Sequence, residues 1–312
     1  MSLTDRENRL IAAARIQAAK EPDEFSASFA EARTITRHHA KSFYFSSIAL
    51  PEYKKRAAYA IYAFCRYADD LIDRAVAEGR DLTHAEEQLG KLLDELYAGD
   101  ARQPWSPAFW LTVEQFAIPR DYFTDLIRGV LMDRGPVRIA DWEGLHRYCY
   151  HVASVVGLMM SKIFELSDPA AQEQAIEMGV AMQLTNILRD VKEDYANNRI
   201  YLPATELAEY SCTEGQIAQG RFDANFRRLM EFQIARAREY YARAVPGIAK
   251  LADDGSQLTV WIMSTVYAGI LDELDKRGAN CFQGRVHVST PRKLLLLVKA
   301  WWSWRRQRKG RA

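Results

Sequence analysis

Residues 183–194 read QLTNILRDVKED, and this stretch decides how the chain around it folds. Its spacing predicts a helix, because at about 100° per residue the polar positions fall on a single stripe. Leu184, Ile187 and Leu188 take other bearings, so the same helix still has an apolar side to bury. Taken alone, the stripe is equally compatible with a solvated helix surface. Its members are Gln183, Asn186, Asp190 and Asp194.

A second acidic stripe lies about 120 residues earlier. Residues 53–77 read YKKRAAYAIYAFCRYADDLIDRAVA, a helical pattern without glycine or proline. Asp69 and Asp73 stand four residues apart on one edge, where like charges repel and weaken an isolated helix. Arg66, one turn before Asp69, supplies a neutralising cation. The alternative is a surface pair between Arg66 and Asp70, with Asp73 in solvent.

Composition bounds the class of protein. The chain has 312 residues, of which 48% are hydrophobic, and a net charge of +1. This is ordinary for a globular protein with a large core, and it gives no reason to expect a nucleic-acid partner. Four scattered cysteines indicate a reducing cytoplasm rather than disulfides or zinc. The N-terminus is too polar for a signal peptide, and no apolar run reaches about 18 residues, so we expect a soluble or peripheral protein.

Helical patterns follow one another without a strand series, a repeat or a linker. The pattern predicts an all-α fold with one domain over residues 28–299. A polar extension (1–27) with a short amphipathic patch at Leu10–Ala19 precedes it, and a basic, aromatic tail (300–312) follows. The predicted helices span residues 53–77, 83–97, 108–117, 119–133, 141–166, 169–197, 203–210, 213–219, 225–245 and 256–277.

Facing each other across a bundle, the two stripes would form an opening lined with carboxylates. Neither stripe contains a histidine, so the oxygen ligands suit a hard cation such as Mg²⁺. Mg²⁺ usually binds through one or two carboxylates together with substrate phosphates, and it neutralises a departing diphosphate. Arg66, Arg189 and Lys41 add charged donors for phosphate oxygens. The pattern therefore indicates a substrate with a hydrocarbon tail that ends in a diphosphate.

At these residues the chain resembles the squalene and phytoene synthases, which join two prenyl diphosphates head to head. The resemblance runs from about residue 32 to residue 299. It is carried by HHAKSFYF (38–45), YAFCRYADDLID (62–73), YCYHVASVVG (148–157) and QLTNILRDVKEDYANNRIYLP (183–203). It implies a single-domain isoprenoid synthase bundle with a central apolar cavity.

The resemblance also implies roles for particular residues. The Mg²⁺ ligands, which would also accept Mn²⁺, would be Asp69, Asp73, Asp190 and Asp194. Diphosphate would contact Lys41, Ser42, Arg66, Arg189 and Tyr267, with Gln183 and Asn186 lining the opening. Tyr62 and Tyr148 would face the allylic cation, and so belong with Arg66, Asp69 and Asp190 to the catalytic set. The prenyl cavity would be lined by Phe43, Val152, Ala153, Val156 and Gly157. One departure is Lys192, which stands where a glycine is common; we expect it on the outer face.

Two products remain open within this family. HHAKSFYF and the segment CFQGRVHVSTPRKLLLLVKAW (281–301) favour condensation of two geranylgeranyl diphosphates to phytoene, through a cyclopropylcarbinyl diphosphate. The alternative joins two farnesyl diphosphates to presqualene diphosphate, squalene or dehydrosqualene, and only squalene would require NADPH. Other classes are a terpene cyclase, a chain-elongating prenyltransferase and a catalytically dead assembly factor. The last would require loss of an aspartate, and all four are present.

The tail bears on location. Leucines and tryptophans alternate there with lysines and arginines, a composition typical of a helix lying in a membrane interface. We therefore expect either contact with the inner membrane face or a packed last helix with a free basic end. A downstream desaturase or cyclase is a further expected partner.

Overall fold

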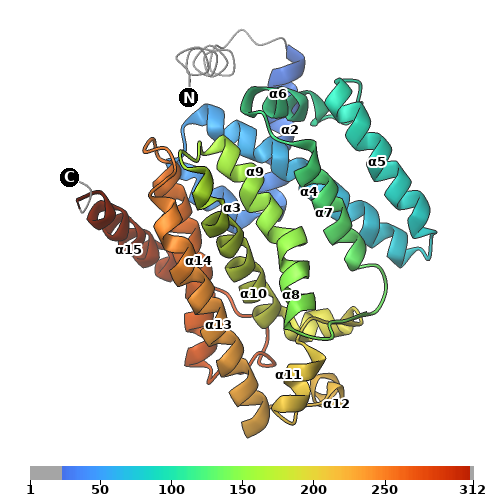
Figure 1. The fold of residues 1–312 in the computed structure, drawn as a ribbon, viewed down its shortest axis with the longest axis vertical. Coiled ribbons are helices and arrows are strands. Elements are labelled where there is room, and N and C mark those ends of the chain that lie inside the picture. The colour runs from blue at the N-terminus through green and yellow to red at the C-terminus, as the bar shows by residue number, and fades with distance from the viewer. Residues whose placement is uncertain (1–22, 310–312) are drawn as a thin grey trace.

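The computed structural model describes residues 23–309, and within that range it is almost entirely helical (Figure 1). The prediction of an all-α fold is confirmed. The amphipathic patch at Leu10–Ala19 lies outside the described residues. Helical structure is already present at Asp23, before the predicted start at residue 28. The first half contains α2 (Asp23–His39), α3 (Lys41–Ser46), a 3-10 turn (Ser47–Ala49), α4 (Glu52–Ala77), α5 (Leu82–Ala98), α6 (Ser106–Phe116) and α7 (Arg120–Met132).

The boundaries of these helices follow from local chemistry. Pro51 caps α4, and the Asp81 side chain accepts a hydrogen bond from the Thr83 amide at the start of α5. Gly99 ends α5 in the left-handed conformation, with φ of 80°, which a glycine adopts without strain. The start of α5 is therefore set by a side-chain cap, whereas the start of α4 and the end of α5 are set by the backbone conformations of Pro51 and Gly99.

The predicted helix over residues 141–166 is interrupted. The structure has α8 (Trp142–Cys149), a π-helical segment (Tyr150–Ser154) and α9 (Val155–Ile163). Two neighbouring helices approach this segment through glycines: a Cβ on Gly129 of α7 would lie 2.8 Å from the His151 backbone, and one on Gly179 would collide with Ser154. Such single π turns inside α-helices are frequent at functional sites.

The second half of the chain is organised around α10 (Gln172–Ala196), which lies in the middle of the bundle (Figure 1). It packs against α9, the π-helical segment, α13 and α14. Two short strands, β1 (Val137–Arg138) and β2 (Arg199–Ile200), form a parallel pair beside it. The remaining elements are a 3-10 turn (Pro169–Ala171), α11 (Ala204–Glu209), α12 (Glu214–Gln219), α13 (Ala224–Ile248), α14 (Ser256–Lys276) and α15 (Thr290–Lys309).

Helix α15 runs through residue 299, where the sequence placed a domain boundary, and packs along α14. Leu296 and Ala300 are buried in this contact. The predicted domain limits stay a prediction.

The apolar core consists of two clusters. One is built from α4 to α7 and α9, with Phe64, Phe109 and Phe123 at its centre. The other is built mainly from α8, α10, α13 and α14. Val260 of α14 packs against both. The functional cavity lies where these clusters meet.

Candidate functional site

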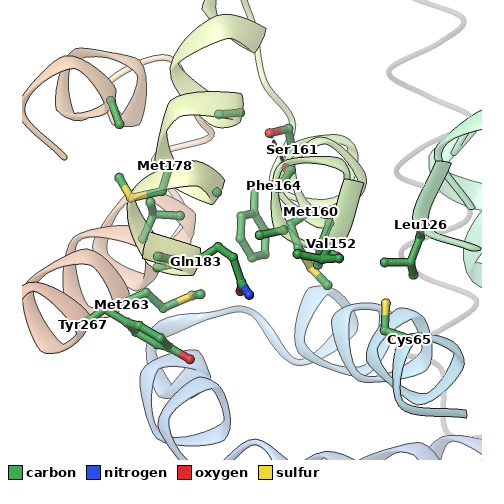
Figure 2. Close-up of a pocket in the computed structure, with 18 of the residues that line it drawn as sticks. Cys65, Leu126, Val152, Met160, Ser161, Phe164, Met178, Gln183, Met263 and Tyr267 are labelled. Carbon is green, nitrogen blue, oxygen red and sulfur yellow. Dashed lines mark hydrogen bonds between the residues drawn. The ribbon is translucent and has the colours of Figure 1, made fainter. Parts of the chain in front are cut away.

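A cavity of about 490 Å³ lies between the two clusters. Its walls come from α4, α7, the α8–α9 segment, α10, α13 and α14. Figure 2 shows Met178 and Gln183 of α10, with Tyr267 of α14, facing Val152 and Met160 across the space. Along α10 it extends from Gln174 to Asn186, which is about 18 Å at 1.5 Å per residue. This is an elongated apolar space suited to a chain-like ligand.

One end of the cavity is charged; we call this end the mouth. Its residues are Arg66, Asp69, Asp73, Asp133, Arg189, Asp190, Asp194, Arg199 and Arg285. Arg66, Asp69 and Asp133 line the cavity itself. The opposite end is apolar, and we call it the closed end; it is lined by Phe164, Leu166 and Leu251.

The structure brings most of the predicted site residues to the cavity. Those that line it are Tyr62, Arg66, Asp69, Tyr148, Val152, Ala153, Val156, Gly157, Gln183, Asn186 and Tyr267. Of the small residues on the α8–α9 segment, Ser154 instead packs against Gly179, and its hydroxyl donates to the Ile176 carbonyl at 2.7 Å. The roles of the lining residues stay predictions.

Of the predicted site residues outside the lining, four belong to the mouth (Asp73, Arg189, Asp190 and Asp194) and three lie on α3. Lys41 is exposed at the start of α3, and Ser42 follows it half-buried. Phe43 is buried, with its ring 6.1 Å from the rings of both Tyr59 and Tyr62. Phe43 therefore supports Tyr62 from behind rather than facing the cavity.

Carboxylates crowd the mouth. Burial raises the pKa of Asp69 to about 6, and repulsion from Asp73 adds to this effect. Burial likewise raises the pKa of Asp194 to about 7, with repulsion from Asp190 and Asp133. Asp133 is thus within electrostatic reach of both acidic stripes. The shared cation site that the sequence predicted between the two stripes stays a prediction.

Arginines neutralise part of this charge. Arg66 binds Asp69 at 3.0 Å and also pairs with Asp70. Arg66 therefore neutralises the acidic stripe and forms the alternative i,i+4 pair at the same time. Arg189 donates to Asp190 at 2.8 Å. Arg285, which the sequence did not single out, reaches the same carboxylate at 3.2 Å from the segment before α15.

The sequence also missed a buried cluster beside the mouth. Asp133 accepts hydrogen bonds from the hydroxyls of Tyr148 at 2.9 Å and Tyr201 at 2.7 Å. The two tyrosine rings stack, with centroids 4.7 Å apart. Arg199 joins the cluster to the first stripe, because it donates to the Asp133 carbonyl and to Asp73. Asp133 ends a helix before the helix-breaking sequence Arg134-Gly135-Pro136. This position was the only signal in the sequence that could have identified Asp133 as a site residue.

Two arginines still have unused donors. Within residues 23–309, the buried Nε atoms of Arg66 and Arg199 have no hydrogen-bond partner. A buried donor without an acceptor is costly, so both atoms fit an anionic oxygen placed in the mouth. In the same described range no three acidic, histidine or cysteine side chains are close enough to hold a metal ion by themselves. The donor set therefore fits Mg²⁺ only together with phosphate oxygens.

Aromatic rings stand between the mouth and the apolar wall. Burial raises the pKa of the Tyr62 and Tyr148 phenols far above neutrality, so both side chains stay uncharged. Uncharged rings at the cavity surface can stabilise a carbocation through their negative faces.

An all-helical bundle with a carboxylate and arginine mouth above an elongated apolar cavity defines a prenyltransferase. Residues 36–292 match the model of the squalene/phytoene synthase family, and the chain belongs to that family. It is 39% identical to a 15-cis-phytoene synthase from Synechocystis, over 86% of this chain and 83% of that protein. It is 37% identical to a phytoene synthase from Arthrospira platensis, over 88% of this chain and 93% of that one.

Solved structures agree with this fold. A dehydrosqualene synthase in complex with a ligand superposes with a TM-score of 0.83 at 29% identity, over 91% of this chain and 98% of that chain. A squalene synthase from Alicyclobacillus acidocaldarius gives a TM-score of 0.76 at 26% identity, over 83% and 97%. The prediction of the family and of the isoprenoid synthase fold is confirmed.

Proposed function

We propose that this enzyme condenses two geranylgeranyl diphosphates head to head to phytoene, through a cyclopropylcarbinyl diphosphate, with Mg²⁺ as its cofactor. The observation that carries the proposal is an elongated apolar cavity with Arg66, Asp69 and Asp133 at one end, where Asp133 is within electrostatic reach of both aspartate stripes. Curated relatives named phytoene synthase at 37–39% identity support the choice of product.

Each part of the mouth then has a task. The residues that would hold Mg²⁺, or Mn²⁺ in its place, are Asp69, Asp73, Asp190 and Asp194; when bound, the metal neutralises the charge that develops on the departing diphosphate. Arg66 and Arg199 donate their unused Nε–H groups to diphosphate oxygens. Tyr62 and Tyr148 present neutral rings to the allylic cation. The apolar walls exclude water that would otherwise quench it.

The direct test supplies purified protein and Mg²⁺ with radiolabelled geranylgeranyl or farnesyl diphosphate, each with and without NADPH. We expect phytoene from the C20 donor without reductant. A protein that consumes neither donor contradicts the proposal. Conversion of the farnesyl donor alone instead supports the second candidate, presqualene diphosphate, squalene or dehydrosqualene, which the similarity to the dehydrosqualene synthase structure favours.

We also infer contact with a membrane surface through α15. No helix within residues 23–309 is long and apolar enough to cross a bilayer. Helix α15 buries one side on α14, yet Leu295 is 63% and Trp302 is 55% exposed on another. Residues 290–309 include seven lysines and arginines and no aspartate or glutamate, so the charge complements anionic lipid. The enzyme would then act in the cytoplasm at the inner membrane face, where a desaturase or cyclase could take up its product.

Flotation with vesicles containing anionic lipid tests this contact. The wild-type chain should float with the vesicles, whereas a Leu295→Gln/Trp302→Gln variant should stay in the dense fraction. Phe232→Gln serves as the control, because Phe232 is another exposed large hydrophobic residue (36%) but lies on α13 rather than α15. Equal flotation of all three proteins contradicts the inference.

A further inference from the structure

A charged cluster with no part in the mouth lies at the closed end. Lys54 of α4 is fully buried, and its ammonium lies 2.8 Å from an Asp254 oxygen and 3.2 Å from a Glu165 oxygen. It also lies 3.4 Å from the Ser256 hydroxyl. A buried lysine keeps its charge only where such partners replace water. We call Lys54, Glu165 and Asp254 the clasp.

Helix geometry places the clasp far from the mouth. Lys54 precedes Asp69 on α4 by 15 residues, which is about 22 Å at 1.5 Å per residue. Its partners belong to two connecting segments that carry the lining of the closed end. Glu165 lies between Phe164 and Leu166, both of which line the cavity, and Asp254 follows Leu251 by three residues.

These two segments are joined to each other and to the start of α4. The Ala252 amide donates to the Phe164 carbonyl at 3.0 Å, and the Ser167 amide donates to the Lys250 carbonyl at 2.8 Å. Gly255 adopts a φ of 109°, and a Cβ there would collide with the Ala49 carbonyl oxygen. Lys54 forms ion pairs with both segments, the neighbouring Tyr53 hydroxyl donates to Glu165 at 3.5 Å, and Lys250 pairs with Asp168 at 3.2 Å between the segments.

We propose that Lys54 is a positioning residue that fixes the closed end of the cavity and thereby sets the length of prenyl chain the enzyme accepts. The proposal rests on the proposed function, because it takes the cavity ligand to be a prenyl diphosphate. Without the ammonium, two carboxylates face each other without a counter-charge, so the segments that carry Phe164 and Leu251 separate. The last isoprene unit of a C20 tail then loses its contacts with the closed end. A C15 tail is one isoprene unit shorter and depends less on those contacts.

The first measurement compares substrate preference in Lys54→Met with that in a matched control, Lys55→Met. Lys55 is the next residue on α4 and pairs with Glu52 at the protein surface. With Mg²⁺ saturating, kcat/KM is measured for geranylgeranyl and farnesyl diphosphate. Because contacts worth a methylene or more change discrimination by about 10- to 200-fold, we expect the C20 to C15 ratio to fall at least about tenfold in Lys54→Met. The ratio should not change in Lys55→Met, and Lys54→Arg should restore it in part.

The second measurement is independent of turnover. Hydrogen exchange at residues 164–168 and 249–257 should accelerate in Lys54→Met but not in Lys55→Met. Asp254→Asn, which keeps the shape of the side chain and the Glu165 pair, gives a milder version of both effects if Lys54→Met does not fold. An unchanged ratio, an equal loss for both donors, or unchanged exchange overturns the proposal. If the wild-type protein consumes neither donor, the proposed function is overturned instead. Hydrogen exchange alone then tests whether Lys54 fixes the closed end.

Discussion

The two ends of the cavity both gather ionisable side chains, but the pKa values of their carboxyl groups shift in opposite directions. At the mouth, carboxylates from α4, α7 and α10 outnumber the arginines that reach them, and the pKa values of Asp69 and Asp194 are raised. At the closed end one buried lysine lies between two carboxylates. Hydrogen bonds from Lys54 and Ser256 hold the pKa of Asp254 below its usual value, although burial opposes them.

This difference shows how one cavity serves two purposes. Repulsion among the mouth carboxylates is relieved by a bound cation, so that end is built to gain a ligand. At the closed end the buried Lys54 ammonium already lies between Glu165 and Asp254, so these carboxylates have a cationic partner without a bound ion. Carboxyl groups with raised pKa values mark the end that would bind a cation, and a carboxyl group whose pKa is lowered beside a buried lysine marks the fixed end.

The largest effect is expected at the mouth. Asp190→Ala should lower turnover by at least about a hundredfold, because it removes a carboxylate that would position the metal and the diphosphate. Glu193→Gln on the same helix is the matched control, since Glu193 is exposed off the stripe and should keep near-normal rates. Product formation under saturating Mg²⁺ measures both, and normal rates in Asp190→Ala would remove the metal assignment.

The closed end should respond in stability rather than in metal use. Gly255→Ala should lower the free energy of unfolding by about 2–4 kcal/mol, because it adds a collision with the Ala49 carbonyl to the strain of a positive φ. Gly79→Ala isolates the strain: Gly79 has a φ of 62° with nothing within 4 Å of its Cβ, so about 1 kcal/mol is expected. Denaturant unfolding measures the loss in free energy of unfolding for both variants. Equal losses would mean that the closed end rearranges to accommodate the added methyl group.

The smallest effect concerns pH. A carboxyl whose pKa is raised in the folded state binds its proton more tightly there, so its contribution to stability falls as pH rises from about 4 towards 7. Because 46% of the Asp69 side chain is exposed, water moderates its share, and Asp194 should contribute more. Without Mg²⁺, the melting temperature of the wild-type protein should therefore drop more between pH 5.5 and 7.5 than that of Asp69→Asn/Asp194→Asn.

The lowered pKa values of His39 and His146 act in the opposite sense over this range, and both proteins share them. Asp254 titrates below the range. The difference between the two proteins is thus the quantity measured. A wild-type curve that is parallel to that of the variant would contradict the assignment of raised pKa values to the mouth.

Sequence alone predicted the features that depend on helical periodicity. The stripes on α4 and α10 need only the spacing of residues within one helix, whereas the cavity-lining positions around Val152 and Gly157 follow from the resemblance to the family. Asp133 and the clasp were missed because their partners lie far away along the chain: Tyr201 for Asp133, and Glu165 and Asp254 for Lys54. The π-helical segment was missed because its own residues continue the helical pattern, and the glycines that pack closely against it lie on neighbouring helices.

The separation of the apolar core into two clusters has a consequence for cooperativity. A ligand tail in the cavity touches both clusters at once, so it completes a core that the chain alone leaves divided. Substrate should therefore act as a folding ligand, raising the free energy of unfolding with the logarithm of its concentration once that exceeds Kd. With substrate bound, local opening of either cluster should then cost more free energy.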